Sequence, residues 1–163
     1  LASAKFVAQG AYVLAEAASG TPDVIIIATG SEVQFALEAR TELAAAGIGA
    51  RVVSAPSLEW FAEQTVEYRE AVLPTAVKAR VSVEAGISLG WREIVGDAGR
   101  SVSIEHFGAS ADYQRLFREF GITAQAVADA ARRSVATAGG GVDAIRPGGT
   151  QAAPTASGTG DQS

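Results

Sequence analysis

The sequence contains no cysteine, no methionine and no asparagine, and its one histidine is His106. Without cysteine the chain has no disulfide, no thiolate metal site and no cysteine nucleophile. A single histidine excludes any metal site that needs two imidazoles, and the lack of asparagine removes many metal-binding and phosphate-binding motifs. Because there is no Met, Leu1 is not a native start, and we expect the chain to be a fragment or a processed product.

Basic clusters and long apolar runs are also missing. The net charge is −5, from 13 Lys and Arg against 18 Asp and Glu, and no basic cluster is available to neutralise a nucleic-acid backbone. The longest apolar run, residues 24–28, is too short to span a bilayer, and no sustained apolar segment of a signal peptide follows Lys5. We therefore expect a cytoplasmic protein that binds neither nucleic acid nor membrane.

The chain does have alternating strand and helix patterns, and its 48% hydrophobic residues over 163 positions suit one globular domain. Residues 24–28 form a continuous apolar run rich in β-branched residues, typical of a strand buried on both faces of a parallel sheet. Residues 51–54, 81–84 and 101–105 predict further parallel strands, and residues 11–14 an antiparallel edge strand. This order favours an α/β fold, a three-layer, doubly wound, mostly parallel sheet of about five strands with helices on both faces.

Helices are predicted between these strands. Ser31 and Gln34 have the spacing of a capping box at the start of a helix that Gly47 ends. The expected buried face of that helix is Val33, Ala36, Leu37, Leu43 and Ala44. Residues 61–72 and 113–120 predict two more helices, and Thr123 is expected to cap a last one. The buried stripe expected for the last helix is Val127, Ala130, Ala131 and Val135.

The composition changes along the chain and suggests three parts. Residues 1–9 are interpreted as a linker from a preceding domain, and residues 10–136 as the folded domain. From residue 137 to residue 163, Gly, Ala, Thr, Ser and Pro dominate, and large apolar residues are few. Such a segment buries too little apolar surface to offset the entropy of ordering, so we predict a disordered tail over 137–163.

Residues 86–90 match the G-x-S-x-G motif of serine hydrolases, and an autonomous hydrolase is the alternative function. Ser88 would be its nucleophile, His106 its base and Asp97 the residue that orients the imidazole. Two features argue against it. Only 18 positions separate Ser88 from His106, and no glycine-rich oxyanion loop precedes the motif.

The turns after the parallel strands form a second candidate site. In open α/β sheets, ligands bind beyond the carboxyl ends of the strands, where free N–H groups favour an anion. The predicted anion or effector site consists of Gly30, Ser31, Ser54, Glu84, Gly86, His106 and Gly108. Each member also has a purely structural interpretation: Ser31 as a helix cap, His106 as a packing residue, and Glu84 as a partner in a salt bridge or hydrogen bond.

Several longer segments are similar, in order, to the C-terminal domain of the transketolase family. They are Gly-Ala-Tyr-Val-Leu at 10–14, Ile-Ala-Thr-Gly-Ser-Glu-Val at 27–33, Arg-Val-Val-Ser-Ala-Pro-Ser at 51–57, Tyr-Arg-Glu at 68–70, Val-Leu-Pro at 72–74, Val-Glu-Ala-Gly at 83–86, Gly-Trp at 90–91, His-Phe-Gly-Ala-Ser-Ala at 106–111 and Phe-Arg-Glu-Phe-Gly-Ile-Thr at 117–123. The resemblance covers about residues 10–135 and includes the G-x-S-x-G motif within a family segment. Asp112 stands where the family often has Pro, and His106 matches no fixed family residue.

The resemblance implies a parent enzyme that moves two-carbon ketol units between sugar phosphates in the pentose phosphate pathway, using thiamine diphosphate and Mg²⁺. In this family, two preceding domains hold cofactor, metal and substrate across a homodimer. The chain is therefore interpreted as a non-catalytic domain with no catalytic, cofactor-binding or metal-binding residue, supporting assembly and offering an effector site. Its implied partners are the remaining transketolase domains and the second subunit. Residues 96–99 resemble the start of the family's cofactor motif, but that motif ends in Asn, which this sequence lacks.

Overall fold

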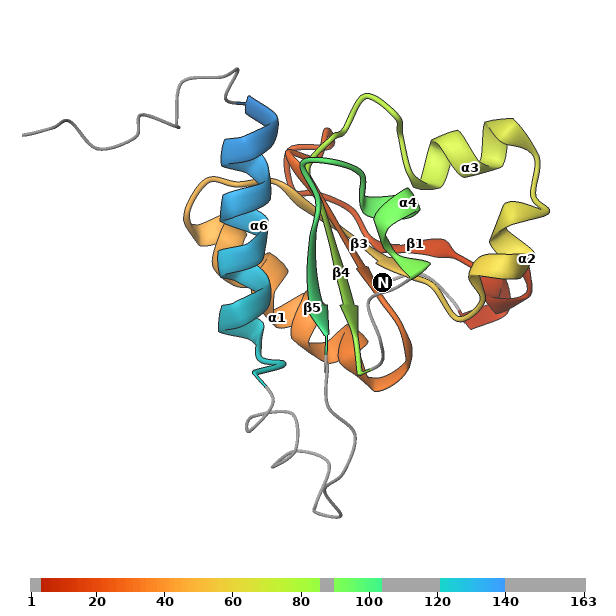
Figure 1. The fold of residues 1–163 in the computed structure, drawn as a ribbon, viewed down its shortest axis with the longest axis horizontal. Coiled ribbons are helices and arrows are strands. Elements are labelled where there is room, and N and C mark those ends of the chain that lie inside the picture. The colour runs from red at the N-terminus through yellow and green to blue at the C-terminus, as the bar shows by residue number, and fades with distance from the viewer. Residues whose placement is uncertain (1–3, 86–89, 104–120, 140–163) are drawn as a thin grey trace, which may run out of the picture.

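A five-stranded sheet forms the centre of the computed structural model, which describes residues 4–85, 90–103 and 121–139 (Figure 1). The strands are β1 (Tyr12–Ala15), β2 (Val24–Ala28), β3 (Ala50–Ser54), β4 (Arg80–Glu84) and β5 (Arg100–Ser103). The α-helices are α1 (Val33–Ala45), α2 (Leu58–Ala62), α3 (Val66–Val72), α4 (Arg92–Val95) and α6 (Ala124–Gly139), with short 3-10 helices η1 (Ala4–Gln9) and η2 (Gly30–Glu32).

The strand order is β1-β3-β2-β4-β5, and the chain crosses over between neighbours as a doubly wound sheet requires. β2 pairs in parallel with β3 and with β4, and β4 pairs in parallel with β5. β1 pairs antiparallel with β3 at the edge of the sheet. The predicted α/β fold with one antiparallel strand is confirmed.

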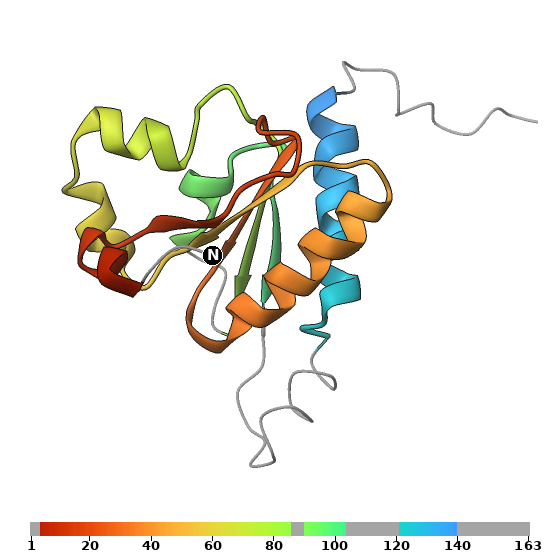
Figure 2. The same ribbon diagram turned by 180° about the vertical axis from the view of Figure 1, so that it is seen from behind.

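Alternating side chains of the central strand divide the core into two layers. Val24 and Ile26 of β2 face the core that includes α1 and α6, whereas Ile25 and Ile27 face the core that includes Phe61 of α2. All four are fully buried, because each face of the strand is covered. Figures 1 and 2 show α1 and α6 on one side of the sheet and α2, α3 and α4 on the other, so the predicted three layers are present.

Helix α1 begins differently from the prediction. Ser31 lies in η2, the N-cap position of α1 is Glu32, and no side chain caps the helix there. The predicted capping box of Ser31 and Gln34 is therefore wrong. Ala36 and Leu43 are buried as expected, but Ala44 is exposed. The predicted end is confirmed, since Gly47 follows the helix with a φ of 78°, a conformation that glycine adopts without strain.

The region predicted as one helix over residues 61–72 contains two. Ser57 caps α2 by accepting a hydrogen bond from the N–H of Trp60, and Thr65 caps α3 by accepting one from Tyr68. The last predicted helix is confirmed as α6, where Thr123 Oγ1 accepts the N–H of Ala126 at 3.1 Å. Val127, Ala130 and Ala131 of α6 are buried, and Val135 is half-buried against the same core.

Two predicted boundaries need comment. Helix α6 continues to Gly139, so residues 137–139 are helical and do not belong to the predicted tail. The predicted helix over 113–120 and the end of the strand over 101–105 lie outside the described residues, as do residues 140–163 of the tail. Within the described ranges, no helix combines the length and the apolar character needed to cross a bilayer.

Candidate functional site

The carboxyl ends of the parallel strands lie together at one edge of the sheet. Ala28 of β2 is in register with Ser54 of β3 and with Val83 of β4, and Glu84 of β4 with Ser103 of β5. Gly30 and Ser31 follow β2 directly in η2. The structure therefore brings Gly30, Ser31, Ser54 and Glu84 to the same edge. The other predicted members, Gly86, His106 and Gly108, lie outside the described residues.

A buried carboxylate that the sequence analysis did not select joins the turn after β2 to the end of β4. Glu32 is 5% exposed, and its Oε1 accepts a hydrogen bond from the N–H of Ala85 at 3.0 Å. Its Oε2 accepts the hydroxyl of Ser31 at 3.3 Å. The carboxylate thus takes a free N–H at this edge that would otherwise be available to an anion.

Glu84 points back into the domain. Its Oε2 accepts a hydrogen bond from Nε1 of Trp91, an indole that is 2% exposed and belongs to the core beneath α2 and α3. Glu84 therefore has a hydrogen-bonded partner within the fold, and its place in an anion site stays a prediction. The indole N–H of a buried Trp needs an acceptor, so this contact fixes the segment after β4 against the sheet.

The electrostatics of the described part of this edge are acidic. Glu32 and Glu84 both lie there, and neither forms an ion pair with a Lys or Arg of the described residues. Their partners are neutral donors: a hydroxyl, a backbone N–H and an indole N–H. Two carboxylates weaken the binding of an anion, and the anion site that includes His106 stays a prediction.

Two cavities lined by described residues lie elsewhere, near the amino ends of β4 and β5. They have volumes of about 440 and 530 Å³. The first is lined by Arg92, Val95, Gly96, Asp97, Gly99, Arg100 and Ser101. Asp97, the third member of the alternative hydrolase, is exposed here. Ser88 and His106 lie outside the described residues.

Arg80 borders the second cavity but serves the fold. Its guanidinium donates to four backbone carbonyls, those of Leu73, Pro74, Val77 and Ile94. Burial lowers the pKa of this guanidinium from its ordinary value. With its donors directed at the backbone, Arg80 ties the loop after α3 to α4.

The family follows from sequence comparison. A family model described as "Transketolase-like TK C-terminal domain" matches residues 10–123. The chain belongs to the transketolase C-terminal domain family. Transketolase of Mycobacterium tuberculosis is 58% identical over 136 residues, which are 81% of this chain and 19% of that protein. Chloroplastic transketolase of Solanum tuberosum is 49% identical over 77% of this chain and 17% of its own length.

Solved transketolases share the fold. Transketolase from Leishmania mexicana matches 90% of this chain with a TM-score of 0.75 and 36% identity, over 20% of its own chain. A Pichia stipitis transketolase in complex with sedoheptulose-7-phosphate matches 83% of this chain with a TM-score of 0.74 and 36% identity, over 19% of its own chain. This transketolase C-terminal domain therefore spans about a fifth of the length of such relatives. The comparisons support the family interpretation and give no support to the hydrolase.

The metal ion that the family implies finds no group of ligands among the described residues of this transketolase C-terminal domain. No three His, Cys, Asp or Glu side chains of residues 4–85, 90–103 and 121–139 are grouped so that they could hold a metal ion. Both carboxylate oxygens of Glu32 and one of Glu84 accept hydrogen bonds within the fold. We therefore assign these residues no step of the ketol transfer.

Proposed function

We propose that this chain is the C-terminal part of a cytoplasmic, homodimeric transketolase, and that the parent enzyme transfers two-carbon ketol units between sugar phosphates. The observation that carries the proposal is the match of residues 10–123 to the C-terminal domain of this family, with 58% identity to a complete transketolase. Thiamine diphosphate and Mg²⁺ would be held by the parts of the enzyme outside this chain. The domain itself would support assembly of the enzyme.

The substrates are proposed to be phosphorylated ketoses and aldoses. The Pichia stipitis transketolases that match this chain were solved with sedoheptulose-7-phosphate, with xylulose-5-phosphate and with fructose-6-phosphate. These three ligands are all ketose phosphates, which suits a donor of two-carbon units. An effector at the carboxyl ends of the strands remains a prediction, and the two carboxylates found there favour weak binding of anions.

The division of labour can be tested by comparing this chain with the full-length enzyme that contains it. Ketol transfer is measured with xylulose-5-phosphate as donor and an aldose phosphate as acceptor, and calorimetry measures binding of thiamine diphosphate with Mg²⁺. We expect transfer and saturable cofactor binding for the full-length enzyme, and neither for the 163-residue chain. Saturable binding by the chain alone at micromolar cofactor would overturn its non-catalytic role, and an inactive full-length enzyme would overturn the assignment of the activity.

A further inference from the structure

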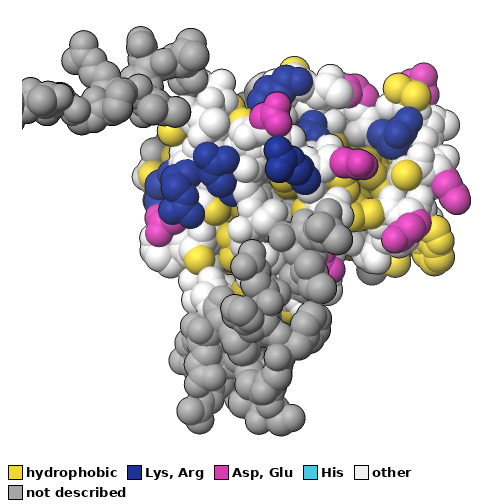
Figure 3. All heavy atoms as spheres, viewed as in Figure 1, with side chains coloured by type: hydrophobic (Ala, Val, Ile, Leu, Met, Phe, Trp, Pro, Cys, Tyr) yellow, Lys and Arg dark blue, Asp and Glu magenta, His cyan; other side chains and the backbone are white. Residues whose placement is uncertain are grey.

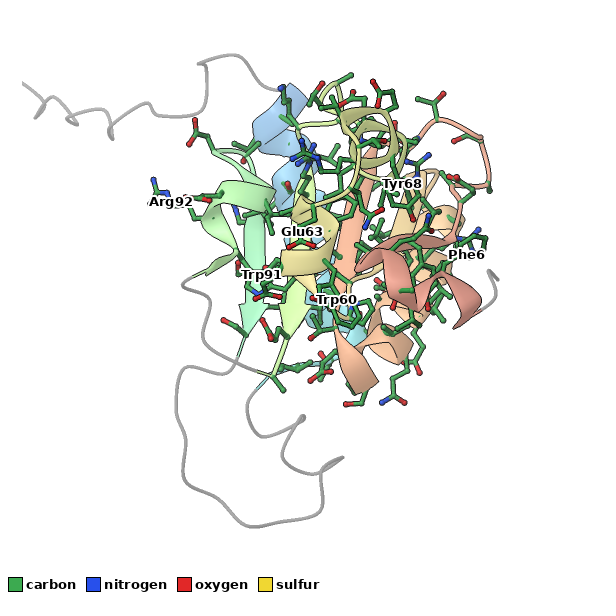
Figure 4. The ribbon with its side chains drawn as sticks, turned by 90° about the vertical axis from the view of Figure 1, so that its right-hand side faces the viewer. Phe6, Trp60, Glu63, Tyr68, Trp91 and Arg92 are labelled. Atoms are coloured by element: carbon green, nitrogen blue, oxygen red, sulfur yellow. The ribbon has the colours of Figure 1, made fainter. Side chains whose placement is uncertain are left out.

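The large apolar side chains that are exposed in the described residues all lie on η1, α2 and α3. Phe6 and Val7 of η1 are 38% and 39% exposed, Trp60 of α2 is 53% exposed, and Val66 of α3 is 66% exposed. We call this region the η1–α2–α3 surface. Figure 4 looks onto it, with Trp60 near the centre of the view and Phe6 towards one side. Grouped exposed apolar side chains mark contact with another protein surface more often than isolated ones do.

The three elements of this surface are held to one another. The N–H of Ser57, which precedes α2, donates to the carbonyl of Gly10 at 2.9 Å. The phenol of Tyr68 on α3 donates to Gln9 Oε1 and to the carbonyl of Ala11. Gly10 has a φ of 80°, and a Cβ there would lie 2.3 Å from the backbone nitrogen of Phe61, so only glycine permits this approach. The surface is therefore preformed, which lowers the entropic cost of docking.

Charges around the apolar side chains are mostly negative. Among residues 58–72, which the structure describes throughout, the exposed charged side chains are four glutamates and one cation: Glu59, Glu63, Glu67, Glu70 and Arg69. In Figure 3, apolar and acidic side chains lie together at the right, where α2 and α3 are. A complementary partner would offer an apolar pocket with basic groups at its rim.

We propose that the η1–α2–α3 surface docks onto the part of the transketolase polypeptide that precedes this domain. The inference rests on the proposed function, because the occupant is the remaining four-fifths of the length that relatives have and this chain does not match. The surface also includes η1, the first described element, through which the chain enters the domain from that part. The surface therefore lies next to the point where the backbone joins the domain to the preceding part of the polypeptide.

Trp60 is the expected anchor of this interface. A Trp side chain offers roughly 150–250 Å² of contact area, and tryptophan is enriched among residues that dominate binding energies. The Trp60 indole is 53% exposed and belongs to neither core cluster, so its removal should affect docking more than the fold of the isolated domain. Trp91 is an internal reference, since it is one of the two tryptophans and is already buried.

Hydroxyl-radical footprinting of the 163-residue chain and of the full-length enzyme tests the proposal. We expect Trp60 to be oxidised rapidly in the chain alone, and its rate in the full-length enzyme to fall to that of Trp91. Leu37 on α1, in the opposite layer, should react equally in both forms. Ketol transfer by the same full-length sample is measured separately, so a failure of the proposed function and a failure of the docking surface give different results.

A matched pair of variants, Trp60→Glu and Gln34→Glu, gives a second readout. Each places a glutamate at an exposed position, Trp60 within the surface and Gln34 on α1. In the full-length enzyme we expect Trp60→Glu to accelerate amide hydrogen exchange in η1 and α2 and to lower the thermal midpoint. Gln34→Glu should change neither, and Trp60→Glu should lower the midpoint of the 163-residue chain by less than it lowers that of the full-length enzyme.

Two results would overturn the proposal. In the first, Trp60 reacts as fast in an active full-length enzyme as in the chain alone. The proposed function would then hold, but the η1–α2–α3 surface would not be an interface. In the second, Trp60 of the chain alone becomes protected as its concentration rises, together with a doubled mass in solution. The occupant would then be a second copy of this domain.

Discussion

At the scale of single residues, three hydroxyl groups satisfy N–H groups at the starts of helices. Ser57, Thr65 and Thr123 accept hydrogen bonds from the N–H groups of Trp60, Tyr68 and Ala126, respectively. Without such acceptors, the first N–H groups of a helix have no partner within the helix. Ser31 lies close to the start of α1 but has a different role, since its hydroxyl donates to Glu32.

This difference gives a prediction for two alanine substitutions. Thr123→Ala should lower the free energy of unfolding by about 1 kcal/mol, the usual loss when an N-cap hydroxyl is removed. Ser31→Ala should cost clearly less, because Ser31 is exposed and caps no helix. Urea denaturation of both variants measures the two losses under the same conditions. A loss for Ser31→Ala as large as that for Thr123→Ala would contradict the structure of η2.

The contacts of Glu32 show that a local sequence pattern cannot predict a hydrogen bond to a residue far along the chain. Ser31 and Gln34 satisfy the spacing rule for a capping box, yet the chain forms η2 at this point instead. The deciding contact joins Glu32 to Ala85, 53 positions away, and no local pattern contains it. Thr123 was predictable because its partner is three residues ahead.

At the scale of elements, the strands were easier to predict than the helices around them. Residues 24–28 are buried on both faces, and their uniform composition indicates this directly. The helices of the layer opposite α1 and α6 are short, and the break between α2 and α3 was missed. Phe61 and Val72 are 11 positions apart, close to three helical turns, so they fit one continuous helix. The cap by Thr65 decides otherwise.

Tyr68 connects these elements, because its hydroxyl donates to Gln9 Oε1 at 2.8 Å and to the carbonyl of Ala11 at 3.0 Å. We expect Tyr68→Phe to lower the free energy of unfolding by about 0.5–1.5 kcal/mol at neutral pH, the net value of a typical hydrogen bond. Chemical denaturation of the 163-residue chain measures this loss.

The difference in the free energy of unfolding between the 163-residue chain and its Tyr68→Phe variant should depend on pH. Burial raises the pKa of the Tyr68 phenol above its ordinary value, since the phenolate is the form that loses solvation. A group with a raised pKa in the folded state contributes its full stability below the pKa of the unfolded state, which is about 10. That contribution is lost as pH rises through the folded-state pKa. The extra free energy of unfolding that Tyr68 gives over Phe should therefore shrink above about pH 10. If it grew there instead, the raised pKa of Tyr68 would be contradicted.

At the scale of the whole molecule, topology made part of the candidate site predictable. Parallel strands end at the same edge, so Gly30, Ser54 and Glu84 could be expected together before their contacts were known. The direction of Glu84 could not be predicted, because it depends on Trp91 and on how the segment after β4 packs. The η1–α2–α3 surface was not predicted either, since exposure of Trp60 depends on the angle at which α2 meets the sheet.

The extent of the folding unit gives the last prediction, which compares chains that end at Gly139 and at Arg133. Ser134 of α6 is fully buried, and its hydroxyl donates to the carbonyl of Ala98 at 2.7 Å and accepts the N–H of Arg80 at 3.0 Å. Val135 packs against the same core. Ending the chain at Arg133 should therefore cost at least about 2 kcal/mol, from the hydrogen bonds and the apolar burial together.

Ending the chain at Gly139 should leave the free energy of unfolding unchanged. Residues 140–163 consist mainly of Gly, Ala, Thr, Ser and Pro, a composition that offers little apolar surface to a core. Urea denaturation of the intact chain and of both shortened chains measures these changes in the free energy of unfolding. Equal midpoints for the two shortened chains would mean that the last turn of α6 contributes nothing. A lower midpoint on removal of 140–163 alone would place part of the folding unit beyond α6.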